Sequence, residues 1–86
     1  MTEPDDGEDF TPLAIGQYEA INDGDDVELA QAMFDACELI VNHRAVATGR
    51  SGSYTSPKYG LLRRLPFSPD MYVYLDSGSG LIVAIV

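Results

Sequence analysis

The spacing of apolar residues changes near residue 44, and this change restricts the chain to a fold with helices first and strands second. Before residue 44, apolar side chains recur every three or four residues, the period of one helix face. These residues are Leu29, Ala30, Met33, Phe34, Cys37, Ile40 and Val41. Asp25 and Glu28 stand three apart, as in a capping box. The sequence therefore predicts a helix from Asp26 to about His43 with one wide face buried.

A shorter helix is predicted upstream of this one. Thr11 supplies a hydroxyl that can cap free amides, and Pro12 suits a first helical position because its missing N–H costs nothing there. The predicted helix runs from Pro12 to about Asn22, and the Asn-Asp-Gly-Asp sequence that begins at Asn22 gives a tight break. Two helices joined so closely should pack as an antiparallel hairpin.

Beyond Arg44 the pattern consists of short β-like segments separated by Gly, Ser and Pro. The sequence predicts a possible short strand at 45–48, a polar loop at 49–57, and strands at 59–67, 71–76 and 81–86. In the strand at 71–76, strict alternation directs Tyr72 and Tyr74 away from the core. The last strand is apolar on both faces, which is typical of a strand in the middle of a sheet.

The chain of 86 residues is long enough for one small core of two packed layers. We therefore predict an α+β fold, with an antiparallel helical hairpin packed on a small three- to four-stranded antiparallel sheet. Residues 1–10, which hold five acids and end at Phe10, are predicted to form a flexible acidic tail. A single domain is expected over residues 11–86.

The net charge of −9 combines two parts of opposite sign. Residues 1–38 hold twelve acids and no Lys or Arg, whereas residues 39–75 hold all five basic residues against Asp70 alone, and Asp76 supplies the remaining charge. Such asymmetry indicates an interaction surface. Two alternatives remain: the acids solvate helix faces while the arginines lie on a polar sheet face, or the acidity is an adaptation to a high-salt host.

The single cysteine and the single histidine exclude several kinds of site. Cys37 has no partner for an internal disulfide, and one His with one Cys cannot build a zinc cluster. Cys37 falls on the apolar helix face, where a small buried hydrophobe is the ordinary interpretation. We expect no cofactor and no metal. The longest apolar stretch, at 81–86, is far shorter than a membrane helix, so we expect no membrane association and a cytoplasmic location.

Chemistry-bearing side chains concentrate in the β half of the sequence. Basic residues and tyrosines occur together there, and arginine with tyrosine suits RNA or a charged protein partner. The basic residues are Arg44, Arg50, Lys58, Arg63 and Arg64, and the tyrosines are Tyr54, Tyr59, Tyr72 and Tyr74. The same mixture also serves a solvent-exposed sheet face, where aromatic residues favour strand formation.

The order of these segments resembles the RelE/ParE toxin superfamily. The residues that carry the resemblance are GLLRRLPF at 60–67 and MYVYLDSGSGLIVAIV at 71–86, with LAQAMFDACELIVNH at 29–43 upstream. The resemblance implies the toxin of a type II toxin–antitoxin pair, whose partner is a cognate antitoxin. RelE-like members cut messenger RNA on the ribosome without a metal, and ParE-like members inhibit DNA gyrase.

By position, the resemblance implies a catalytic or target-binding role for Arg63 or Arg64 and for Tyr74. Contacts with a partner or nucleic acid are assigned to Arg44, Arg50, Lys58 and Tyr72. Because an acidic molecule is repelled by nucleic acid, we favour a toxin that binds a protein over a ribosome-dependent endoribonuclease. The alternatives are an acidic interaction protein, such as an adaptor or nucleic-acid mimic, and an inactivated protein of the toxin fold.

Overall fold

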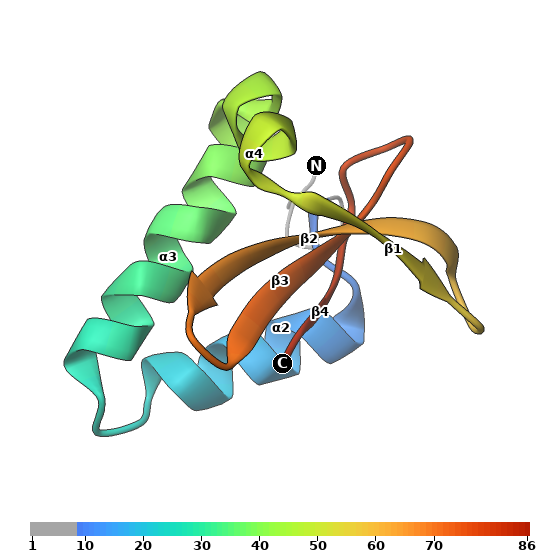
Figure 1. Ribbon diagram of the computed structural model, residues 1–86. Coiled ribbons are helices and arrows are strands. Elements are labelled where there is room, and N and C mark those ends of the chain that lie inside the picture. The colour runs from blue at the N-terminus through green and yellow to red at the C-terminus, as the bar shows by residue number, and fades with distance from the viewer. Residues whose placement is uncertain (1–8) are drawn as a thin grey trace, which may run out of the picture.

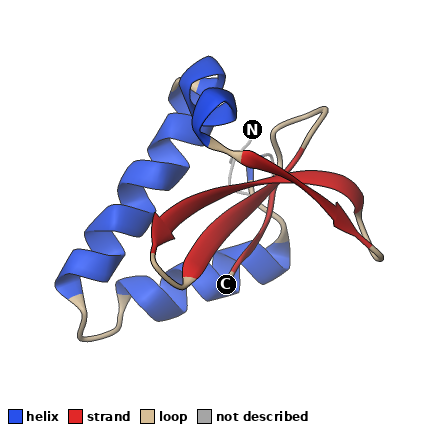
Figure 2. Cartoon of the chain, viewed as in Figure 1, coloured by secondary structure: helices blue, strands red, loops and turns tan. Residues whose placement is uncertain are grey.

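The computed structural model describes residues 9–86, so most of the predicted acidic tail lies outside the described residues. Three helices precede four strands in the chain (Figures 1 and 2). The helices are α2 (Pro12–Asn22), α3 (Val27–Asn42) and α4 (Arg44–Arg50), and the strands are β1 (Gly52–Ser56), β2 (Gly60–Ser68), β3 (Met71–Asp76) and β4 (Ile82–Ile85). Within the described residues, no helix has the length and apolar character needed to cross a membrane.

The predicted α+β class is confirmed. The strands form one antiparallel sheet in the order β1-β2-β3-β4, and α2 and α3 pack on the same side of it (Figure 1). The core between the two layers is apolar, as the predicted helix stripe requires. Its largest fully buried side chains are Met33, Leu75, Ile82, Ile85 and Val73.

The helix boundaries follow the capping signals, with one correction. The Thr11 hydroxyl accepts a hydrogen bond from the Ala14 amide at 3.2 Å, as predicted for the start of α2. At α3 the cap is Asp26, whose Oδ1 accepts from the Leu29 amide at 3.0 Å, and not Asp25. Asp26 is the residue with extended backbone directly before the first helical turn, which is the geometry that an N-cap requires.

Two predictions for residues 45–57 were wrong. The possible strand at 45–48 is part of α4, where Ala47 is fully buried in the core. The polar loop at 49–57 contains β1, which pairs with β2 in the register Gly52↔Arg64 to Ser56↔Gly60. Short apolar runs do not distinguish helix from strand, and β1 has no apolar alternation because most of its residues are exposed.

The last strand, β4, is at the edge of the strand order and not in its middle, which corrects a third prediction. Its outer edge is covered by the chain's own N-terminal part. Phe10 forms a parallel bridge with Ile82, the Thr11 hydroxyl donates to the Val83 carbonyl at 3.0 Å, and the Ile85 amide donates to Gln17 Oε1 at 2.7 Å. Phe10, assigned to the tail by sequence, packs against the core and lies edge-on to Tyr18.

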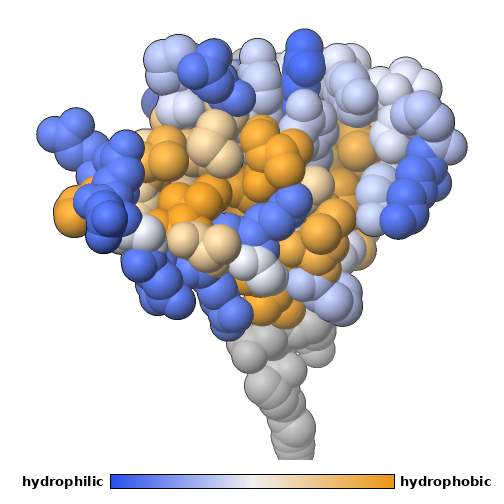
Figure 3. All heavy atoms as spheres, turned by 90° about the horizontal axis from the view of Figure 1, so that it is seen from below, coloured by the Kyte–Doolittle hydropathy of each residue, from blue (hydrophilic) through white to orange (hydrophobic). Residues whose placement is uncertain are grey.

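Among the described residues, part of the apolar surface of the helical layer is exposed. In the view from below, which looks onto α2, apolar side chains gather in the middle of the face and hydrophilic ones lie around them (Figure 3). Leu13 of α2 is 51% exposed. On α3, Phe34 and Val41 are also exposed, although the helical pattern predicted that this whole stripe would be buried.

Candidate functional site

The face of the sheet that points away from the helices carries a cluster of tyrosines around one arginine. Strand alternation and register place Tyr54 of β1, Arg64 of β2 and both Tyr72 and Tyr74 of β3 on this face. Tyr72 and Tyr74 were predicted to point away from the core, and they do. We call these four residues the Tyr–Arg face.

Arg64 lies among the rings of this face. Its guanidinium carbon is 4.6 Å from the centre of the Tyr72 ring and 5.3 Å from that of Tyr54, within the range of cation–π attraction. On the neighbouring strand, Tyr74 lies directly opposite Arg64. Within residues 9–86, no residue accepts a hydrogen bond from the Arg64 guanidinium. Its N–H groups are therefore available to a ligand or to water.

The tyrosine rings also contact one another across the strands. Tyr54 and Tyr74 pack edge-on with their centres 5.2 Å apart, and Tyr72 and Tyr74 are 6.0 Å apart. Leu62 lies between Tyr54 and Asp76 on the same face and is only 2% exposed, which we attribute to cover by the rings above it. The face is thus a packed aromatic surface and not a set of separate exposed side chains.

Arg63 points the other way. It lies opposite Leu75, a core residue, and its guanidinium reaches the end of α4. Its Nε donates to Ser51 Oγ at 2.6 Å, and its Nη2 donates to the carbonyl oxygens of Ser51 at 2.9 Å and Thr48 at 3.2 Å. The structure therefore brings Arg64 and Tyr74 together, and it places Arg63 apart from them as a cap on a helix C-terminus.

Arg44 holds the turn between β3 and β4. Its guanidinium donates to the carbonyl oxygens of Ser79 at 2.5 Å and Gly78 at 3.1 Å. The turn is also organised by Asp76, whose Oδ2 accepts from the amides of Ser79 and Gly78. The hydrogen bonds from Ser79, with smaller contributions from Gly78 and the Arg44 charge, lower the pKa of Asp76 below its usual range.

The other two basic residues predicted to contact a partner also lie outside the Tyr–Arg face. Lys58 is in the turn between β1 and β2, with its amine 5.2 Å from the centre of the Tyr59 ring. Arg50 ends α4 and borders a shallow hollow between α3 and β2. The arrangement thus separates the basic residues that sequence spacing grouped together.

Tyr54 is a site residue that the sequence only partly indicates. It belongs to the basic and aromatic set, but the sequence assigns it to a loop and gives it no role. Its place beside Arg64 depends on the pairing of β1 with β2. The single available signal is a tyrosine among small polar residues, which is compatible with an exposed edge strand.

The chemistry of the Tyr–Arg face is that of a binding surface. A guanidinium flanked by rings can pair with a carboxylate or phosphate, and the tyrosines can stack on planar groups or donate hydrogen bonds. Among residues 9–86, no three His, Cys, Asp or Glu side chains come close enough together to hold a metal ion.

Cys37 lies in the interior, as predicted, and is 5% exposed. Burial raises the pKa of its thiol to about 12. Burial also raises the pKa of nearby Tyr18, with a further contribution from Cys37 itself. A thiol that keeps its proton is a poor nucleophile, so Cys37 serves the packing of α3.

Stability should therefore fall at alkaline pH, and Cys37 should account for part of the fall. The folded state holds the thiol proton until about pH 12, whereas an unfolded chain releases it near pH ~8.5. The stabilisation is complete below the unfolded pKa and is lost as the pH rises above it, by up to roughly tenfold in the folding constant per pH unit.

Urea denaturation in the presence of reductant, on wild type and Cys37→Ala, measures this effect. The stability of Cys37→Ala should decline less steeply above pH ~9. Comparing slopes removes the uniform cost of the smaller side chain. Burial, the larger cause of the raised Tyr18 pKa, acts in both proteins, and only the smaller contribution from Cys37 is lost in the variant. Parallel curves would show that Cys37 does not titrate as its burial requires.

Comparison of the chain with protein-family models, with curated proteins and with solved structures finds no match.

Proposed function

We propose that this protein is the toxin of a type II toxin–antitoxin pair and that it inhibits growth by binding a protein target, as a gyrase inhibitor does. The observation that carries the proposal is the Tyr–Arg face. Three of its four residues lie on β2 and β3, the strands whose sequences resemble the RelE/ParE superfamily, and the helices leave the face uncovered. A cognate antitoxin is the partner that this function requires.

Arg63 and Arg64 point to opposite faces of the sheet, and this arrangement favours binding over RNA cleavage. Metal-independent cleavage needs groups on both sides of a phosphate, one to move a proton and others to stabilise the developing charge. On the Tyr–Arg face the only arginine is Arg64, because Arg63 is engaged with α4. The net charge of −9 also disfavours approach to ribosomal RNA.

Induced expression in bacteria tests the proposal. Wild type should arrest growth, and co-expression of the antitoxin encoded beside it should relieve the arrest. Arg64→Ala and Tyr72→Ala should each abolish the arrest because they remove the charge or the ring from the same contact. Lys58→Ala is the matched control: it removes an exposed positive charge outside the face, and it should arrest growth like wild type.

Each outcome bears on a different part of the proposal. Wild type that fails to arrest growth under any condition would refute the toxin function. Arrest that persists in Arg64→Ala, with the variant shown to be folded by circular dichroism, would remove the Tyr–Arg face from the mechanism. Cleavage of ribosome-bound messenger RNA by wild type would favour the endoribonuclease form of the toxin instead.

A second candidate function is an acidic interaction protein that binds a basic partner. The observation that favours it is the absence of Lys and Arg before Arg44, whereas residues 9–43 hold eight acids. Binding of this kind is electrostatic, so it should weaken strongly as salt is added. A complex with a basic protein that survives high salt would argue against an electrostatic mimic.

A further inference from the structure

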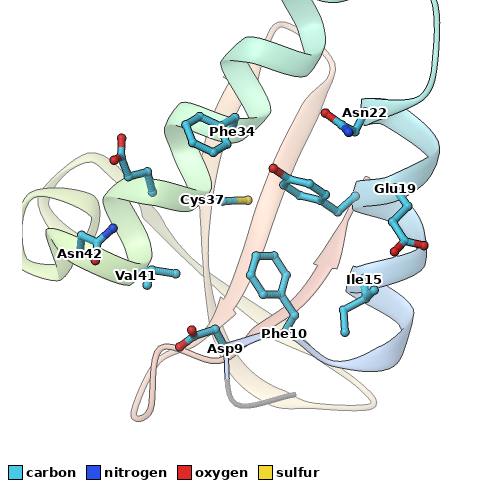
Figure 4. Close-up of a pocket in the computed structure, with 11 residues that line it drawn as sticks. Asp9, Phe10, Ile15, Glu19, Asn22, Phe34, Cys37, Val41 and Asn42 are labelled. Atoms are coloured by element: carbon cyan, nitrogen blue, oxygen red, sulfur yellow. The ribbon is translucent and has the colours of Figure 1, made fainter. Parts of the chain in front are cut away.

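An open apolar groove lies between α2 and α3, on the helix side of the sheet and away from the Tyr–Arg face. Its volume is about 610 Å³. Figure 4 shows Phe34 and Cys37 projecting from α3 into the space between the helices, and Phe10 entering the same space from the N-terminal segment. The apolar side chains that line the groove are Phe10, Ile15, Tyr18, Phe34, Cys37 and Val41.

Two of these side chains belong to a stripe that residues 9–86 leave partly exposed. Phe34 is 49% exposed and Val41 is 44% exposed. They lie seven residues apart on α3, which places them on the same side of the helix two turns apart. A helix stripe of this spacing is normally buried against another element. Within the described residues of α3, Met33 and Ile40 pack in the core, whereas Phe34 and Val41 face the groove.

The rim of the groove is negatively charged. Asp9, Glu19 and Glu38 line it, and no Lys or Arg of the 9–86 segment does. The surrounding helices α2 and α3 carry no basic residue at all. An occupant with an apolar centre and acidic edges would be repelled, whereas one with basic edges would be attracted. A second copy of this chain is disfavoured for the same reason, because its α2 and α3 are acidic.

The lining also determines what backbone conformation fits. The groove is formed mainly by side chains of α2 and α3, with Asp9 and Phe10 at one end, and the internal backbone groups of the two helices are already hydrogen-bonded. An extended peptide would need a strand edge to satisfy its N–H and C=O groups, whereas a helix satisfies its own. A helix laid between α2 and α3 can place side chains of one face against Phe34 and Val41, as in ordinary helix packing.

We infer that the groove between α2 and α3 is the docking site for an amphipathic helix of a partner protein, with an apolar face flanked by Lys and Arg. This inference does not depend on the function proposed for the Tyr–Arg face. Should the partner be an antitoxin, the charge pattern predicts a basic segment in the part that contacts α2 and α3.

The test uses a synthetic helix of about fifteen residues, four turns long, with Leu at spacings of three and four and Lys on either side. It is titrated into isotope-labelled protein and followed by nuclear magnetic resonance. The expected shift changes map to Tyr18, Phe34 and Val41. A peptide with Glu in place of Lys, and one with the same composition in scrambled order, should each bind about tenfold more weakly or not at all.

Two matched variants locate the contact. Phe34→Ala should weaken binding of the Lys peptide by about tenfold because it removes a central aromatic contact. Leu13→Ala removes a side chain of similar exposure, 51% against 49%, from a position that does not line the groove, and it should change the affinity less than about twofold. Both positions are half exposed, so neither substitution opens a core cavity.

Several outcomes would overturn the inference: no binding of the Lys peptide, equal binding of the scrambled peptide, equal losses in the two variants, or shift changes confined to the sheet. Growth arrest by the Phe34→Ala variant separates this result from the proposed function. The variant should still arrest growth, because the Tyr–Arg face is intact. Failure of the toxin experiment would leave the peptide result unaffected.

Discussion

Replacing Arg63 with alanine is expected to lower the free energy of unfolding by about 2–3 kcal/mol, whereas replacing Arg64 should lower it by about 1 kcal/mol. Arg63 donates three hydrogen bonds, two of them to carbonyls near the C-terminus of α4. A cation there is also favoured by the helix dipole. Arg64 contributes only two cation–π contacts on a partly exposed face.

Urea denaturation of the two single variants measures this difference between adjacent residues of one strand. Arg63→Lys provides a further control, since it keeps the charge but loses the planar fork that reaches Ser51 and Thr48 together. It should retain part of the stability. Equal losses in Arg63→Ala and Arg64→Ala would contradict the assignment of Arg63 to α4.

Replacing Gly80 with alanine should destabilise the protein by about 2–3 kcal/mol, for two separate reasons. The backbone at Gly80 has φ +79°, a conformation that an L side chain rarely adopts. A Cβ atom there would also overlap the Arg44 guanidinium at Nη1 and Cζ. The Arg44 side chain would have to move, and it would lose its hydrogen bonds to Ser79 and Gly78.

Two other glycines separate these causes. Gly60 has φ +81° but open space around it, so Gly60→Ala measures the backbone strain alone, about 1 kcal/mol. Gly78 has no positive φ, and a Cβ there meets only ordinary contact, so Gly78→Ala should change stability by less than about 0.5 kcal/mol.

A double-mutant cycle with Arg44→Ala completes the test. In that background the clash with the guanidinium is gone, so Gly80→Ala should cost about as much as Gly60→Ala. The same cost in both backgrounds would show that Arg44 does not restrain the β3–β4 turn. All five variants can be compared by thermal or urea unfolding.

Capping residues and regular apolar spacing predicted the elements in which these local patterns are strong. The cap at Thr11 and the period of three and four along α3 predicted α2 and α3, and alternation predicted β3 with its observed bounds. The signals failed where the cause lies elsewhere in the chain. Strand β1 forms by pairing with β2, and the outer edge of β4 is covered by Phe10 and by Gln17 of α2, which the apolar pattern of β4 does not indicate.

The sequence predicted which residue types make up the candidate site, but not which of those residues lie together. Strand β2 has buried leucines on both faces, with Leu62 under the tyrosines and Leu65 in the main core. Alternation therefore gives no indication of which of Arg63 and Arg64 points outward. That choice depends on α4, an element that the sequence pattern did not predict.

The attachment of β1 makes the two arginines interdependent. Strand β1 contributes none of the described core residues, so it is held mainly by its pairing with β2 and by what anchors its start. On the helix side of the sheet, Arg63 donates hydrogen bonds to Ser51, the residue just before β1. On the opposite side, β1 supplies Tyr54 to Arg64. Loss of the Arg63 hydrogen bonds would therefore let β1 fray and would remove Tyr54 from the side of Arg64. A substitution outside the Tyr–Arg face would then still loosen that face.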